Sequence, residues 1–207
     1  MIGRFITLEG GEGVGKSTQL RRLVTALRER GIDVIETREP GGSDGAETIR
    51  ALLLQGQGDR WTPCTEALLF AAARADHVAR TIRPALRAGQ WVVCDRFLDS
   101  SLAYQGGADG IGIAAIRTLH TIGSDGLLPD RTFLLELESG TAAARGAERD
   151  GGRTDRIGGR TAEYHRDVAA TFRRLAAEEP ARIRPIDASG LPDAVTARMI
   201  DALGDLL

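Results

Sequence analysis

The chain has 207 residues, of which 42% are hydrophobic and 27% are charged, and its formal net charge is −2 at pH 7. This length and composition predict one folded α/β domain over residues 1–207 and argue against a disordered chain. The balanced charge gives no general attraction to nucleic acid or to an anionic membrane, and no apolar run approaches the ~20 residues that span a bilayer. We therefore expect a cytoplasmic protein whose ligands bind at a local cluster of side chains.

Strand and helix patterns alternate along the chain. Apolar runs predict strands at 4–9, 33–37, 91–94, 132–137 and 183–187, and helical periodicity predicts helices at 16–30, 43–55, 63–88, 111–123, 161–178 and 191–206. Strands that alternate with helices imply right-handed crossovers. The expected fold is a three-layer one, a five-stranded parallel sheet with helices on both faces.

A glycine-rich loop separates the first strand from the first helix. Gly10 and Gly15, with Lys16 and Ser17 directly after them, satisfy the pattern of glycine, four residues, glycine, lysine and serine or threonine. Glycines let backbone N–H groups face a phosphate, and the helix N-terminus adds its dipole. The lysine reaches the β/γ oxygens and the serine is a ligand for Mg²⁺. The pattern predicts binding of ATP and Mg²⁺ by the run of residues Gly10, Gly11, Glu12, Gly13, Val14, Gly15, Lys16, Ser17 and Thr18.

The composition supports this interpretation of the loop. Among 27 basic residues, Lys16 is the only lysine. Coding bias toward arginine explains the scarcity of lysine, but the one position where lysine occurs is the one at which the loop requires it.

A carboxylate and a guanidinium follow the third strand. Asp95 and Arg96 come directly after Trp91-Val92-Val93-Cys94, at the carboxyl edge of the sheet where ligands of open α/β folds bind. Asp95 can act on the metal or its waters, and Arg96 can hold the transferring phosphoryl group. The alternative is that Asp95 only caps the following helix.

Three further side chains suit an acceptor nucleotide. Arg38 follows the second strand, beside Pro40, and a guanidinium there can clamp a phosphate. Phe70 and Arg74 are four residues apart on one predicted helix face, where a ring can stack on a base and a guanidinium can bond its carbonyl edge. A solvated arginine at 38 and a core phenylalanine beside a surface arginine remain alternatives.

An arginine-rich segment at about 145–160 breaks the helical pattern with several glycines. Such a segment is typical of a lid that closes over ATP and brings positive charge to the transition state. A solvated helix face is the competing interpretation, and the glycines argue against one regular helix.

Five motifs in this order resemble bacterial thymidylate kinase, a P-loop nucleoside monophosphate kinase family, over nearly the whole chain. They are Phe5-Ile6-Thr7-Leu8-Glu9 with the glycine-rich loop, Thr37-Arg38-Glu39-Pro40-Gly41-Gly42, Phe70-Ala71-Ala72-Ala73-Arg74, Asp95-Arg96-Phe97 and Ser100-Ser101-Leu102-Ala103-Tyr104-Gln105-Gly106-Gly107. The resemblance implies transfer of the ATP γ-phosphoryl group to thymidine monophosphate, giving the diphosphate and ADP in dTTP synthesis, by a homodimer.

The resemblance also implies roles for single residues. Glu12 approaches the acceptor 3′-hydroxyl, Arg38 and Arg96 hold its phosphate, Phe70 stacks on thymine and Arg74 donates to a thymine carbonyl. Ser101, Tyr104 and Gln105 form the wall around base and deoxyribose, and Pro40 is a further substrate-binding residue. Asp95 lies near Mg²⁺, and Arg149 and Arg153 are the lid arginines that meet the ATP phosphates. The chain departs from the family at Phe97, where tyrosine or histidine is common, and at Ser101, where an amide or threonine can bond the base.

Two other functions compete with this one. A P-loop kinase for another nucleoside monophosphate or for a deoxynucleoside shares the loop, and so does a nucleotide-dependent switch ATPase or GTPase. A guanine-reading Asn-Lys-x-Asp motif requires a second lysine, which this chain lacks.

Overall fold

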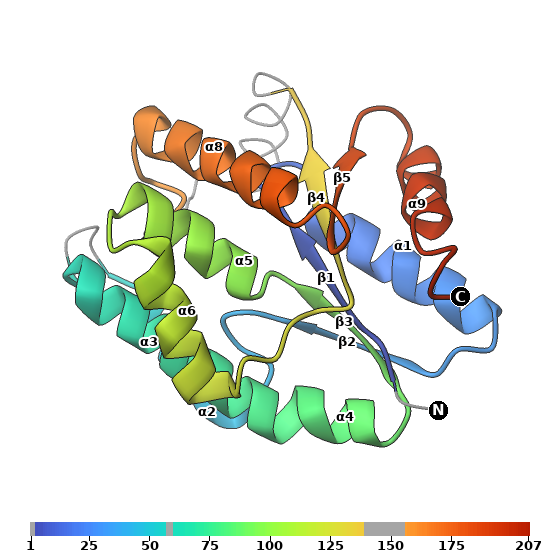
Figure 1. Ribbon diagram of the computed structural model, residues 1–207, viewed down its shortest axis with the longest axis horizontal. Helices are drawn as coiled ribbons and strands as arrows, with labels where there is room; N and C mark the ends of the chain where they lie inside the picture. Colours follow the sequence, from blue (N-terminus) through green and yellow to red (C-terminus); the bar gives the residue numbers. More distant parts are fainter. Residues whose placement is uncertain (1–2, 57–59, 139–155) are drawn as a thin grey trace.

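The computed structural model describes residues 3–56, 60–138 and 156–207. Their strands form one parallel sheet in the order β2-β3-β1-β4-β5, at the centre of Figure 1. The bounds are β1 (Phe5–Glu9), β2 (Val34–Arg38), β3 (Trp91–Asp95), β4 (Arg131–Glu136) and β5 (Ile183–Asp187). The predicted five-stranded parallel sheet is confirmed, with each strand within one residue of its expected ends.

Helices cover both faces of this sheet. Their bounds are α1 (Lys16–Glu29), α2 (Asp44–Leu54), α3 (Pro63–His77), η1 (Val78–Ile82), α4 (Arg83–Arg87), α5 (Leu98–Ser101), η2 (Leu102–Ala108), α6 (Ile113–Ser124), α8 (Ala162–Glu178) and α9 (Pro192–Asp201). The predicted helix at 63–88 is present as the run α3, η1 and α4. Its middle part widens to a π-helix just before Pro84, whose ring cannot donate a backbone hydrogen bond.

Sequence patterns missed the helical run of α5 and η2, residues 98–108. Serines and glycines interrupt its apolar periodicity, so the helix signal is weak. The structure explains one of these glycines, because a Cβ at Gly107 would collide with Thr171 of α8. Close packing of η2 on α8 therefore needs a residue that is unfavourable inside a helix. The terminal helix is also shorter than the predicted 191–206, since α9 ends at Asp201.

The sheet divides the apolar core into two layers. Alternate strand residues point to opposite faces, so Phe5 packs with α3, η2 and α8, whereas Ile6 and Leu8 pack with α1 and α9. Figure 1 shows α1 and α9 together on one side of the sheet, and α8, α5 and α6 on the other. Because both faces are covered, the central strands β1 and β3 are mostly apolar, as expected for a parallel sheet.

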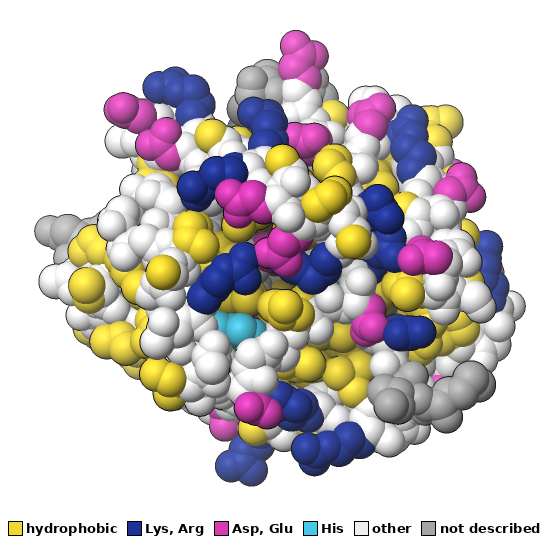
Figure 2. Space-filling model, in the orientation of Figure 1, with side chains coloured by type: hydrophobic (Ala, Val, Ile, Leu, Met, Phe, Trp, Pro, Cys, Tyr) yellow, Lys and Arg dark blue, Asp and Glu magenta, His cyan; other side chains and the backbone are white. Residues whose placement is uncertain are grey.

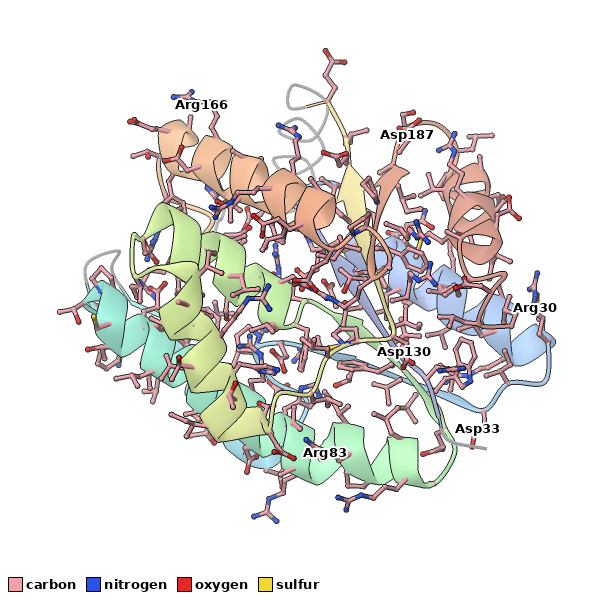
Figure 3. All side chains as sticks on the ribbon, viewed as in Figure 1. Arg30, Asp33, Arg83, Asp130, Arg166 and Asp187 are labelled. Atoms are coloured by element: carbon pink, nitrogen blue, oxygen red, sulfur yellow. The ribbon has the colours of Figure 1, made fainter. Side chains whose placement is uncertain are left out.

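Polar contacts secure the edge of the sheet opposite the glycine-rich loop. Asp130, labelled in Figure 3 just before β4, accepts hydrogen bonds from Arg4 Nη1 at 2.9 Å and from the backbone N–H of Phe5 at 2.8 Å. Arg83, also labelled, donates to the carbonyl of Ser124 at 2.9 Å and so joins α4 to the end of α6. The Asp130 contacts tie the start of β1 to the start of β4, and the Arg83 contact ties α4 to α6.

Charged side chains of both signs are interspersed over the face seen in Figure 2. On that face basic residues do not gather into a single broad patch. This distribution agrees with the near-neutral net charge and with binding at a local site.

A buried ion pair ties α5 to the two strands beyond it. Asp99, which is 1% exposed, accepts hydrogen bonds from Arg182 Nη1 at 2.7 Å and Nη2 at 2.8 Å, and from Thr132 Oγ1 at 3.1 Å. A bidentate pair of this kind has good geometry, and removing one partner leaves a buried charge uncompensated.

We expect Asp99→Asn to lower the free energy of unfolding by about 3 kcal/mol, because Arg182 loses its buried charged partner and keeps only its contacts with Thr132 and Glu179 beside a neutral amide. Urea unfolding followed by circular dichroism measures this change. The control is Arg4→Gln, which removes the exposed ion pair with Asp130 and should cost less than about 1 kcal/mol. Equal losses in the two variants would contradict the expectation.

Candidate active site

The glycine-rich loop connects β1 to α1 and curls as its sequence requires. Gly10 and Gly15 have φ of 131° and 93°, in the region that favours glycine. A Cβ at Gly10 would also lie 2.5 Å from the carbonyl oxygen of Leu135. Gly15 caps α1, so the N-terminus of this helix opens onto the loop. The backbone of the loop therefore has the curled form expected of a phosphate cradle.

Lys16 lies folded into the loop. Its ammonium group donates to the carbonyl oxygens of Gly10 at 3.1 Å and Gly11 at 2.6 Å. Burial lowers the pKa of Lys16 to about 7, and the nearby Arg96 guanidinium adds to this effect. A lysine with such a low pKa gains its charge readily when an anion arrives. Lys16 therefore lies at the loop as a buried amine whose charge depends on pH near neutrality.

Asp95 and Ser17 meet at the ends of β3 and the loop. Ser17 Oγ donates to Asp95 Oδ2 at 3.0 Å, which brings together the two side chains predicted to serve the metal. Asp95 Oδ1 is buried and has no hydrogen-bond partner among the residues that the structure describes. A buried carboxylate oxygen without a partner beside a hydroxyl is a donor set that suits a hard cation.

Arg96 adopts a backbone conformation that is uncommon for a residue with a side chain, with φ of 68°. Its guanidinium donates to the Gly10 carbonyl at 3.2 Å and to Ser100 Oγ at 3.1 Å, and it lies 5.3 Å from the centre of the Tyr104 ring. These contacts aim a positive group at the boundary between the loop and the neighbouring pocket. Strained backbone of this kind is concentrated at functional sites.

Beside the loop the structure contains a pocket between α3 and the run of α5 and η2. Its lining includes most of the predicted acceptor-site residues, from the glycine-rich loop through to η2. They are Glu12, Pro40, Phe70, Arg74, Arg96, Ser101, Tyr104 and Gln105. Residues that sequence reasoning did not assign also line it, namely Glu39, Arg50, Leu54, Phe97, Ser100 and Ile157.

Arg74 is held rigidly in this pocket and is 3% exposed. Its Nε donates to Glu39 Oε2 at 2.8 Å, and its Nη2 donates to the Phe97 carbonyl at 3.2 Å and to Ser101 Oγ at 2.9 Å. Nη1 is therefore the nitrogen left to donate to a ligand. A fixed N–H donor of this kind matches the carbonyl edge of a base.

Glu39 is the unassigned residue that holds this guanidinium. Its second oxygen, Oε1, lies 3.1 Å from His77 Nδ1, and His77 Nε2 lies 2.7 Å from Thr37 Oγ1. Glu39 belongs to the motif Thr37-Arg38-Glu39-Pro40-Gly41-Gly42, but no role was predicted for it. The sequence did hold a signal for this role. Glu39 directly follows Arg38 at the end of a predicted strand, and Arg74 lies on a predicted helix.

The structure does not bring every predicted residue to the pocket. Arg38 lies at the end of β2, and its Nη2 donates to the Glu47 carboxylate at 3.1 Å and 3.2 Å, so its role at the acceptor phosphate stays a prediction. Arg149 and Arg153 lie outside the described residues, as does most of the expected lid. Phe97 packs edge-on against Phe5 with ring centres 4.8 Å apart, so its side chain belongs to the core.

The parallel sheet, with this loop between β1 and α1 and an arginine-lined pocket beside it, defines a protein of the P-loop kinase fold. A family model described as thymidylate kinase matches residues 8–199. The chain is 69% identical over 207 residues to a thymidylate kinase of Rhizorhabdus wittichii, covering 100% of both chains. It is 46% identical over 203 residues to one of Caulobacter vibrioides, covering 97% of this chain and 96% of the relative.

A solved structure is also similar. The crystal structure of thymidylate kinase from Ehrlichia chaffeensis superposes with a TM-score of 0.78 at 32% identity, covering 98% of this chain and 99% of the other. The chain belongs to the thymidylate kinase family.

The low pKa of Lys16 leads to a measurable proton balance. From this pKa we expect the amine to be mostly neutral at pH 8 in the free protein and to become charged beside bound phosphates. We expect ADP binding at pH 8 to take up nearly one proton, and the uptake to fall to about half a proton near pH 7 and to disappear about one pH unit lower. Calorimetric titrations in Tris and in HEPES buffer give the number of protons. The control is Lys16→Met, in which the uptake should be absent, and zero uptake by the unaltered protein at pH 8 would contradict the expectation.

Proposed function

We propose that this protein transfers the γ-phosphoryl group of ATP to thymidine monophosphate at the junction of the loop and the pocket. Membership of the thymidylate kinase family gives the reaction, phosphorylation of thymidine monophosphate. The observation that carries the proposal is that Glu12 and Arg96 belong to both places. Each contributes to the glycine-rich loop region and also lines the pocket beside it.

In the proposed binding mode the pocket takes the thymine base of the acceptor. Phe70 offers a ring face, Arg74 Nη1 donates to a carbonyl, and Ser101 offers a hydroxyl fixed by Arg74 Nη2. An exocyclic amine in place of that carbonyl, as in cytosine, would bring its own N–H donors against the N–H donor of Arg74. The buried Tyr104 hydroxyl, which has no partner within the described residues, lies in the same wall.

The donor side of the site fits ATP and Mg²⁺. Ser17 and Asp95 are the residues that would hold the metal, and the unpartnered Asp95 Oδ1 supports this assignment. When bound, Mg²⁺ supplies charge neutralisation on the phosphates of ATP. In the described part of the chain no group of three or more His, Cys, Asp or Glu residues could hold a metal, so phosphate and water would complete the shell, as is usual for Mg²⁺.

Catalysis in this scheme is positioning and charge stabilisation. The acceptor phosphate is already ionised, so it needs no strong base. The Lys16 amine becomes protonated where it meets the β/γ oxygens of ATP. Arg96 holds the transferring phosphoryl group from the side of the acceptor. Arg149 and Arg153 keep their predicted roles as lid arginines, and Arg38 keeps its role at the acceptor phosphate.

The two alternative functions are less well supported. A kinase for a different nucleoside monophosphate would not explain why the family match extends over residues 8–199. A switch ATPase would not need a pocket in which Arg74 is fixed from three sides.

We place the protein in the cytoplasm and propose that it is a homodimer. No helix in the described ranges has both the length and the apolar character required to cross a bilayer.

Two exposed apolar side chains support the proposed homodimer. Ile122 on α6 and Leu68 on α3 are 77% and 56% exposed. These two helices lie against each other, because a Cβ at Gly123 would be 3.3 Å from Ala75 Cβ. Exposed apolar side chains on adjoining helices support an interface between two copies.

Turnover with a panel of acceptors tests the proposed reaction. ADP production with ATP and Mg²⁺ should be fastest with thymidine monophosphate and slower with the monophosphates of deoxyuridine, uridine, cytidine and adenosine. Lys16→Ala should lower the rate by about 10³-fold, because a positioned charge on the phosphates is lost. Equal rates with all acceptors, or hydrolysis without any, would overturn the base assignment.

Light scattering after size exclusion tests the dimer. We expect twice the chain mass of 22.1 kDa for the unaltered protein and a shift toward the single-chain mass for Ile122→Lys, because a buried ammonium would destabilise the interface. The control is Leu191→Lys, at an exposed apolar position that precedes α9, which should leave the mass unchanged. A single-chain mass for the unaltered protein at micromolar concentration would refute the proposal.

A further inference from the structure

Glu66, in the first turns of α3, is a fully buried carboxylate with three partners. Its Oε1 accepts a hydrogen bond from Gln105 Nε2 at 3.0 Å. Its Oε2 accepts from Arg160 Nη2 at 2.9 Å and also from Arg156 Nη2. One side chain of α3 therefore joins η2 to the segment that precedes α8.

The charges in this cluster balance. Arg160 also pairs with Asp109, so among the residues that the structure describes two carboxylates face two guanidiniums. The Arg156 side chain is completely buried, and its Nε donates to the Leu53 carbonyl at 2.9 Å. Arg160 lies 4.5 Å from the centre of the Tyr164 ring. These arginines were expected to belong to a lid that brings charge to ATP, but here their guanidiniums are bound to acidic side chains.

The segment that Glu66 holds forms part of the acceptor pocket. Ile157, between the two arginines, lines this pocket. Gly158 lies against the glycine-rich loop, because a Cβ there would be 2.6 Å from Glu12 Oε2. Gln105, the third partner, is itself a wall residue. All three groups attached to Glu66 thus contribute to, or flank, the place where the monophosphate is proposed to bind.

The Glu66 carboxylate also determines the orientation of the Gln105 amide. An ionised carboxylate only accepts hydrogen bonds, so the amide must direct its NH₂ group to Glu66. Its carbonyl oxygen, Oε1, is then the atom of this side chain that can accept a hydrogen bond from a ligand. Without Glu66 the amide could turn over and present a donor in the same place.

We propose that Glu66 is a positioning residue for the acceptor pocket, which orients the Gln105 amide and holds the segment from Arg156 to Arg160 against the pocket and Glu12. The inference rests on the proposed function, because it concerns how the same pocket receives the monophosphate. Glu66 acts through its partners and does not line the pocket itself. Its position on α3 is one helical turn before Phe70 and two turns before Arg74, on the same helix face.

Glu66→Gln tests this role, since it keeps the shape and removes the charge. We expect the KM for thymidine monophosphate to rise about tenfold, whereas the Kd for ADP changes less than about twofold. The matched control is Asp205→Asn, which removes a carboxylate from another buried arginine, Arg131, at the opposite edge of the sheet. Its KM should be unchanged. A KM within twofold of the unaltered protein in folded Glu66→Gln, or an equal loss in ADP affinity, would overturn the proposal.

A double-mutant cycle with Gln105→Met gives a readout that a merely structural role would not change. If Glu66 acts through the amide, Glu66→Gln should raise the KM less in the Gln105→Met background than alone. Full additivity would overturn the amide part of the proposal. If Glu66→Gln does not fold, Arg160→Gln, at a partly exposed position, is used in its place. The same rise in KM is expected, and a KM within twofold of the unaltered protein would again overturn the proposal.

The unaltered protein is assayed first with thymidine monophosphate, so that the two proposals fail separately. No turnover there would remove the proposed function itself. Turnover with an unchanged KM in the variants would remove only the role of Glu66.

Discussion

The site depends on one buried carboxylate at the end of β1. Glu9 accepts hydrogen bonds from the backbone N–H groups of Phe97 at 2.7 Å and Ser100 at 3.3 Å, and from Ser100 Oγ at 2.6 Å. Burial raises the pKa of Glu9 to about 7, and the charge of Asp99 adds to this effect. The glycine-rich loop begins at the next residue, whereas Phe97 and Ser100 line the pocket beside it. Glu9 therefore fixes the loop and the pocket relative to each other, and Arg96 lies at their junction.

Buried arginines connect the helices and strands around that junction by binding carboxylates. Arg74, Arg156 and Arg182 are all buried, and each meets a carboxylate through one or more nitrogens. A guanidinium can bond several acceptors at once in a fixed plane, so it can connect elements that are distant in sequence. Such buried pairs contribute little net stability, but breaking one is costly, and this favours a single arrangement of α3, η2 and the start of α8.

Much of the fold could be predicted because its signals are local. Apolar runs and helical periodicity gave all five strands and most helices, and the loop motif located Lys16 and Ser17. The run of α5 and η2 could not be predicted, since packing of Gly107 against Thr171, a tertiary contact, permits glycine there. The same holds for Glu39 and Glu66. Glutamates in a loop motif and in a first helical turn look like solvated or capping residues until their buried arginine partners, far away in the sequence, are known.

The solitary lysine has a consequence for covalent chemistry on this protein. Lys16 provides the only side-chain amine in the chain, it is 8% exposed, and its pKa near 7 leaves a large share of it unprotonated and nucleophilic in neutral solution. Acylating reagents therefore have one side-chain amine to modify, and it lies at the phosphate cradle. Acetylation at that atom would remove the charge that we propose acts on the phosphates, so we expect modification of the lysine side chain and loss of nucleotide binding to occur together.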